Sequence, residues 1–227
     1  MPDIACVNGR FGPVAEAVVS IEDRGFQFGD GVYEVIRTYR GKPFAFEEHL
    51  ARFERSAQAL HLSMGLTREQ WLALVQEGLR LSRFPETKIY LQVTRGPAPR
   101  DHPFPASTAP TTVLTFRELH PLEDSIRKAG VRAITLEDIR WGRCDIKSVN
   151  LLANVLARQR AKEAGVFEAI LVRDGFITEG SVSNVMVVRN GAIETAPEGP
   201  RILSGVTRAI VLELARKEGL PVVEAFV

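Results

Sequence analysis

The stretch from residue 96 to residue 105 is the feature that most limits how this chain can fold. Its sequence, GPAPRDHPFP, holds five prolines and glycines in ten residues. Proline fixes φ and lacks a backbone donor, so neither a helix nor a strand can run through this stretch. β-rich runs at 87–95 and 111–117 flank it. We therefore expect a long, stiffened loop between two strands, and long loops in compact domains are often functional.

The rest of the first half alternates strand and helix patterns. Period-two alternation predicts strands, and apolar residues at helical spacing predict helices. The His120-Pro121-Leu122 sequence predicts a linker. The expected elements are strands at 3–9, 14–20 and 32–39, a hairpin turn at 40–42, and helices near 47–60 and 67–82.

The second half repeats this mixture, so we predict two α+β domains, 1–119 and 120–227. The final residues, 219–227, look like a strand with no closing element after it. We expect the larger second domain to be truncated at its C-terminal end, or the chain to be an incomplete product. The expected elements are strands at 131–136 and 184–189, helices at about 148–164 and 205–218, a hairpin about Asp174-Gly175, and a turn at Asn190-Gly191.

Composition favours a cytoplasmic enzyme that acts on small molecules. The 29 basic and 28 acidic residues give a formal net charge of +1, which provides no electrostatic footprint for nucleic acid or an anionic membrane. No apolar run approaches the roughly 20 residues that cross a bilayer, and no secretory signal is visible at the N-terminus. Two cysteines fit a reducing compartment better than a disulfide framework, and the four scattered histidines show no metal-ligand spacing.

Lys147 is the first candidate for chemistry. It lies between Ile146 and Val149, just before a predicted helix. A lysine in an apolar setting loses hydration, which frees its amine for Schiff-base formation. The ordinary alternatives are an ion pair with Asp145 or a solvated helix start, and the spacing alone favours those alternatives.

Two further segments could bind a polar ligand. Glu179 precedes small polar residues that lead into a predicted strand, although the same residues could form a turn with a solvated carboxylate. The segment Leu203-Ser204-Gly205-Val206-Thr207 opens a predicted helix, whose first N–H groups would bind an anion. A simple Ser/Thr N-cap is the commoner explanation for such a segment.

Four other side chains are candidates in the first half. Arg52 could reach a phosphate or pair with Glu48 at i,i+4. Arg100 and His102 on the loop could bind a carboxylate, or be ordinary loop charges. Tyr33 could donate a phenol hydrogen bond, or be a half-buried strand aromatic.

Taken in order, these segments resemble the fold type IV pyridoxal-phosphate transaminases, and among them the D-amino-acid transaminases most. The resemblance runs from about residue 20 to the end of the chain. It rests on Asp23–Glu34, Arg95-Gly96 with Arg100-x-His102, Cys144–Ser148, Glu179-Gly180-Ser181-x-Ser183-Asn184, and Leu203-x-Gly205-x-Thr207-Arg208.

The resemblance implies a role for each candidate. Lys147 would form the Schiff base with pyridoxal 5′-phosphate and shuttle the proton, and Glu179 would bond the pyridine nitrogen. Leu203 would pack on the ring. Arg52, Gly205, Val206 and Thr207 would hold the phosphate, and Tyr33, Arg100 and His102 would bind the substrate carboxylate.

The resemblance also implies a homodimer, because in this family the Arg-x-His loop completes the neighbouring subunit's site. The reaction would transfer an amino group between a D-amino acid and a 2-oxo acid, for example from D-alanine to 2-oxoglutarate, giving pyruvate and D-glutamate. The alternatives are an aminodeoxychorismate lyase, a branched-chain aminotransferase, or a truncated, inactive remnant. Val182 departs from the family pattern, since close relatives usually carry a serine there.

Overall fold

A computed structural model describes residues 3–227 of the chain. Within them, two compact units form: one extends to Pro121 and includes Lys147–Asn150, and the other comprises Leu122–Ile146 and Leu151–Val227. A division near residue 120 would assign Lys147 to the second unit, whereas the segment around it groups with the first. That the two parts are independent folding domains stays a prediction.

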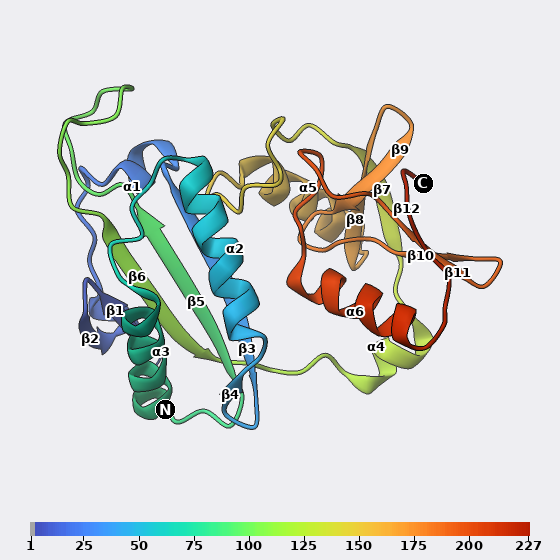
Figure 1. Ribbon diagram of the computed structural model, residues 1–227, viewed down its shortest axis with the longest axis horizontal. Helices are drawn as coiled ribbons and strands as arrows, with labels where there is room; N and C mark the ends of the chain where they lie inside the picture. Colours follow the sequence, from blue (N-terminus) through green and yellow to red (C-terminus); the bar gives the residue numbers. More distant parts are fainter. Residues whose placement is uncertain (1–2) are drawn as a thin grey trace. The chain divides into compact units, whose positions relative to one another are not determined.

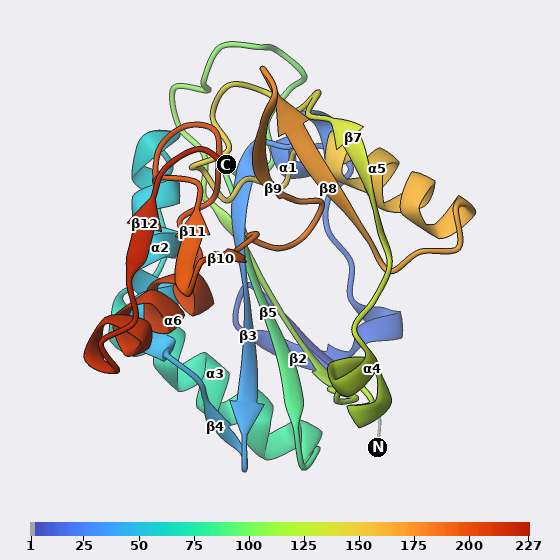
Figure 2. The same cartoon turned by 90° about the vertical axis from the view of Figure 1, so that its right-hand side faces the viewer.

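The first unit is built on a six-stranded sheet in the order β2-β1-β6-β5-β3-β4. All its strand pairs are antiparallel. Helices α2 and α3 lie on one face of this sheet, α2 against β3, and α3 against β1 and β6 (Figures 1 and 2). The elements are β1 (Ile4–Val7), β2 (Arg10–Pro13), α1 (Arg24–Phe28), β3 (Gly31–Tyr39), β4 (Lys42–Pro43), α2 (Phe46–Ala59), α3 (Arg68–Ser82), β5 (Thr87–Thr94) and β6 (Thr111–Glu118).

Periodicity explains the elements of this unit that the sequence predicts correctly. Leu50, Phe53 and Ala57 are fully or almost fully buried on one face of α2, as helical spacing requires. Thr67 caps α3 in a capping box with Gln70. The long loop between β5 and β6 is also confirmed, and it extends from the end of the sheet (green in Figure 1).

In the first 31 residues one predicted strand is wrong and one helix was not predicted. The expected strand at 14–20 is a short 3-10 helix, Val14–Glu16, followed by irregular chain, because β2 ends at Pro13. The glycine-rich stretch contains helix α1. Asp23 caps that helix by accepting the Gly25 N–H at 2.8 Å, and Gly29 ends it in the left-handed conformation.

The second unit contains two three-stranded sheets, in the orders β7-β8-β9 and β10-β11-β12. Helix α5 packs on β7 and β8 around Ala157, Ala161, Ala169 and Leu171. Helix α4 was not predicted from the sequence. The elements are α4 (Asp124–Ala129), β7 (Ala133–Glu137), α5 (Leu152–Glu163), β8 (Glu168–Arg173), β9 (Phe176–Gly180), β10 (Val187–Arg189), β11 (Ala192–Thr195), α6 (Val206–Lys217) and β12 (Val222–Glu224).

Among residues 3–227, no helix has the length and apolarity that a bilayer-spanning segment needs. In the same residues, no group of three or more His, Cys, Asp or Glu side chains is arranged to hold a metal ion.

Candidate active site

The backbone of Lys147 is fixed beside strand β3. Its N–H donates to Ser56 Oγ at 3.1 Å, and its carbonyl accepts the Tyr33 N–H at 3.0 Å. The Val149 N–H donates to the carbonyl of Gly31 at 3.0 Å. Residues 147–149 therefore run along β3, and α5 begins only at Leu152. The prediction that the helix starts near 148 is wrong, because this pairing holds the chain extended.

The side chain of Lys147 lies on Tyr33. Its Nζ is 4.2 Å from the centre of the Tyr33 ring, which attracts an ammonium group through its π face. Tyr33 in turn stacks on Tyr90, with ring centres 5.6 Å apart. The structure thus brings together two of the predicted site residues. Asp145, the alternative partner considered for Lys147, is paired with Arg143.

Arg52 belongs to a buried cluster around Glu34. Its Nε and Nη2 each donate to a Glu34 carboxylate oxygen at 2.7 Å, and His49 Nδ1 lies 2.8 Å from the same carboxylate. The partner is therefore Glu34 rather than Glu48. Burial alone would raise the pKa of Glu34, but hydrogen bonds from Arg52 and His49 outweigh it, and the pKa lies below its ordinary value.

The sequence assigned no role to Glu34 or His49, although a signal for them was present. His49 and Arg52 stand at i,i+3 on the apolar face of α2, where basic side chains require a buried acidic partner. That Arg52 binds a phosphate stays a prediction.

Arg100 and His102 are brought together on the loop between β5 and β6. Both contact Phe28 of α1: the Arg100 guanidinium carbon is 5.1 Å from the ring centre, and the His102 ring centre is 5.5 Å from it. Both residues are exposed. Their donors can therefore meet a ligand from outside the first unit.

In the second unit, Glu179 is buried at the end of β9 and contacts three donors. Arg140 Nη1 donates to Oε1, while Asn184 Nδ2 and the Leu203 N–H both donate to Oε2 at 3.0 Å. The alternative that Glu179 is a solvated carboxylate is therefore wrong. A carboxylate offers about four acceptor positions, so three donors leave about one position for a further N–H. This arrangement fits a protonated pyridine nitrogen.

Burial sets the acidity of Glu179. It raises the pKa of the carboxyl above its ordinary value, although Arg140 and the Leu203 N–H act in the opposite direction. Arg140 is shared with Asp138, to which its Nε and Nη2 donate at 2.9 and 2.8 Å. Neither Arg140 nor Asp138 carries a signal in the sequence that predicts a place in the site.

The start of α6 is linked to Glu179 through Asn184. Asn184 Nδ2 also donates to the Leu203 carbonyl at 2.9 Å. A Cβ on Gly205 would lie 2.0 Å from Asn184 Oδ1, so any larger residue would have to displace the Asn184 side chain. Gly205 is the N-cap, with no side-chain cap, and Val206 and Thr207 are the first helical residues. A Ser/Thr N-cap is therefore not the explanation of this segment, and the helix start suits an anion.

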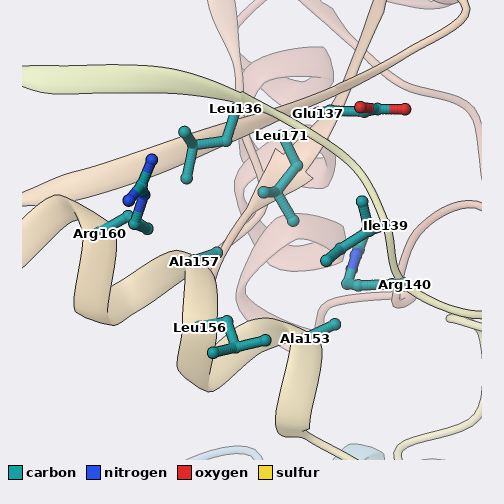
Figure 3. A pocket seen from close by; sticks show the side chains of 9 residues that line it. All are labelled: Leu136, Glu137, Ile139, Arg140, Ala153, Leu156, Ala157, Arg160 and Leu171. Atoms are coloured by element: carbon teal, nitrogen blue, oxygen red, sulfur yellow. The ribbon is translucent and has the colours of Figure 1, made fainter.

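An apolar hollow of about 180 Å³ lies elsewhere in the second unit. Figure 3 shows Leu136 and Leu171 pointing from β7 and β8 towards α5, which contributes Ala153, Leu156 and others. Arg140 lines this hollow, but no residue predicted for the site does so.

Comparison with known proteins places this geometry in a family. The model of the class IV aminotransferases matches residues 31–227. D-alanine aminotransferase of Bacillus licheniformis is 46% identical over 214 residues, 94% of this chain and 75% of that protein. The enzyme of the same name from Staphylococcus haemolyticus is 44% identical over 215 residues, 95% of this chain and 76% of that protein. This chain thus spans about three quarters of their length.

Solved structures agree on the fold. The branched-chain amino acid aminotransferase of Escherichia coli superposes with a TM-score of 0.89 at 22% identity, covering 100% of this chain and 78% of that one. The branched-chain enzyme of the archaeon Thermoproteus uzoniensis, solved with norvaline, gives 0.86 at 25% identity, covering 99% of this chain and 78% of that one. These likenesses confirm the predicted fold type IV architecture. The chain belongs to the class IV aminotransferase family.

Proposed function

We propose that this chain catalyses a pyridoxal-phosphate-dependent transamination between a D-amino acid and a 2-oxo acid. The identity of 44–46% with D-alanine aminotransferases is the observation that carries the proposal. The expected substrates are D-alanine and 2-oxoglutarate, and the expected products are pyruvate and D-glutamate.

The residues of the two units support the cofactor assignment separately. Lys147 offers an amine on a backbone that is fixed beside β3, as a covalent attachment point requires. Glu179 offers a buried carboxylate with about one acceptor position left for the ring nitrogen. When bound, the cofactor supplies an electron sink for the carbanion at the substrate Cα.

The other predicted cofactor-binding residues are assigned to the phosphate group and to the pyridine ring. We assign the phosphate to Arg52 and to the start of α6, at Gly205, Val206 and Thr207, where helix N–H groups attract an anion. Leu203 is assigned to the face of the ring.

Lys147 would then move the proton at the substrate Cα, which is the step that exchanges amino acid for 2-oxo acid. The substrate carboxylate is assigned to Tyr33, Arg100 and His102. Arg100 and His102 are exposed on their loop, which is consistent with their binding the substrate carboxylate in the site of a neighbouring subunit of a homodimer.

We also propose a cytoplasmic location, in keeping with the two cysteines, Cys6 and Cys144, both buried and free.

A half-reaction tests the stereochemical claim. The protein loaded with pyridoxal phosphate is mixed with D-alanine or L-alanine, and the cofactor absorbance and pyruvate are followed. D-alanine should change the spectrum and release pyruvate. A change with L-alanine alone would contradict the proposal.

The branched-chain aminotransferase is the second candidate, since solved enzymes of that name share the fold at 22% and 25% identity. L-leucine as an amino donor separates the two candidates. Analysis of the products also tests the alternative of a lyase, because a lyase yields no aminated 2-oxo acid.

A further inference from the structure

We propose that Arg24, held by Asp30, is a positioning residue that presets the loop carrying Arg100 and His102 for the substrate α-carboxylate. The inference rests on the proposed function, in which that pair binds the carboxylate. It assigns a role to two residues of the first unit that do not themselves touch the substrate.

Arg24 reaches the two peptide groups that flank His102, two residues after Arg100 on the same loop. Its Nη1 donates to the Asp101 carbonyl at 2.5 Å, and its Nη2 donates to the His102 carbonyl at 3.1 Å. Its Nε donates to Asp30 Oδ2 at 2.8 Å. Each of the three guanidinium nitrogens thus donates one hydrogen bond: one to the carboxylate of Asp30 and two to carbonyls of the loop. Only 3% of Arg24 is exposed, so these bonds are protected from water.

A second arginine fixes Asp30 from the other side. Arg95 Nε and Nη2 donate to the two carboxylate oxygens of Asp30 at 2.8 and 3.0 Å. Arg95 also donates to the carbonyls of Leu60 and His61, just beyond the end of α2. Asp30 is therefore tied to the body of the unit, and it orients Arg24 rather than moving with the loop.

The two arginines, Arg24 and Arg95, stabilise the charged form of Asp30. Burial would raise the pKa of Asp30, but hydrogen bonds from Arg95 and Arg24 outweigh it and hold the pKa below its ordinary value. Asp30 therefore stays ionised at neutral pH. The Arg95 guanidinium carbon also lies 3.7 Å from the centre of the Phe104 ring, which adds a contact further along the same loop.

This arrangement lowers the cost of binding. An exposed loop that must become ordered around a ligand loses conformational entropy, whereas a loop fixed beforehand loses less. Lysine cannot replace Arg24, because one ammonium group does not present the planar fork that serves an acid and two carbonyls together. The effect should therefore appear in the substrate KM and leave the chemistry of Lys147 unchanged.

The experiment compares Arg24→Lys with wild type as full chains loaded with pyridoxal phosphate. The KM for D-alanine should rise about tenfold, the loss expected from one or two charge-assisted hydrogen bonds. The kcat and the absorbance of the bound cofactor should not change. Reactivity with D-alaninol, which has no carboxylate, should also be unchanged. Asp30→Asn should shift KM in the same direction, and Arg80→Lys, at an exposed ion pair, should leave it unaltered.

Two measurements separate positioning from a general structural effect. Amide hydrogen exchange within residues 99–106 should become faster in Arg24→Lys, while exchange within β3 stays as in wild type. In a background carrying Arg100→Gln and His102→Gln, Arg24→Lys should cause no further rise in KM, because coupled residues are not additive.

The outcomes distinguish this inference from the proposed function. If Arg100→Gln raises KM and Arg24→Lys does not, the positioning role is overturned and the proposed function stands. A further rise from Arg24→Lys in the doubly substituted background would also overturn the positioning role. If Arg100→Gln and His102→Gln leave KM unchanged, the two residues do not bind the substrate carboxylate, and the positioning role of Arg24 is overturned as well.

Discussion

Arg140 contacts Glu179 and also donates two hydrogen bonds to Asp138, so one buried guanidinium serves two carboxylates. Asp138 has a further cation, Arg173, at 3.1 Å. The two acids consequently differ: the pKa of Asp138 falls to about 2, whereas that of Glu179 is raised by burial. Arg140 therefore connects the proposed partner of the pyridine nitrogen to the stability of the second unit.

Replacement of Arg140 should destabilise the protein strongly. Arg140→Gln leaves the buried Glu179 without its cation and leaves Asp138 with Arg173 as its remaining cation. Breaking such a buried pair costs about 3–5 kcal/mol. Urea unfolding measures the loss. Arg143→Gln removes an exposed pair with Asp145 and should leave the free energy of unfolding almost unchanged. Equal losses from the two variants would contradict the assignment.

Asp138 should make stability fall in acid. Burial opposes its ionisation, yet the hydrogen bonds and charge of Arg140 and the hydroxyl of Thr178 lower its pKa from 3.8 to about 2. A depressed pKa contributes stability above the unfolded value, and the contribution is lost as the pH falls through the folded value. Between about pH 4 and pH 2, wild type should therefore lose about 2 kcal/mol that Asp138→Asn does not lose. Parallel pH profiles of unfolding free energy would refute this.

Removing the charge of Glu34 should destabilise the protein. Glu34→Gln leaves Arg52 and His49 without their buried acid, and we expect a loss of about 3–5 kcal/mol in unfolding free energy. Glu77→Gln, at an exposed pair with Arg80, should leave the free energy of unfolding almost unchanged. A small effect of Glu34→Gln would show that the cluster contributes little to stability.

Gly205→Ala should weaken cofactor binding. The new Cβ would lie 2.0 Å from Asn184 Oδ1, so Asn184 must move away from Glu179 and Leu203. We expect the Kd for pyridoxal phosphate to rise by about tenfold or more, since one or two hydrogen bonds are disturbed. Gly142→Ala is the control, because, apart from its chain neighbours, no atom of the described residues lies within 4 Å of its added Cβ. Fluorescence titration with the cofactor measures both.

Local patterns predicted the longer helices and strands but missed the short helices α1 and α4 and the polar network. Helices α2 and α3 carry strong apolar periodicity, and the β3–β4 turn contains Gly41, which tolerates its positive φ. Arg140 has no such signal. Its partners Thr178 and Glu179 lie about forty residues away, and the pairing of β7 with β8 and of β8 with β9 brings them close.

The candidate site was predicted from the order of its motifs rather than from any one residue. Lys147 illustrates this, because its flanking sequence suggested a helix start. Its actual position depends on pairing with β3, more than a hundred residues earlier in the chain. Long-range pairing of this kind leaves no periodicity near Lys147 for sequence analysis to detect.

Borohydride reduction of the protein loaded with pyridoxal phosphate, followed by peptide mapping, tests the central claim most directly. Reduction fixes a Schiff base as a stable adduct, so the modified peptide identifies the lysine. We predict one adduct, on Lys147, and none in Lys147→Ala. An adduct on another lysine, such as Lys162, with Lys147 unmodified would contradict the account.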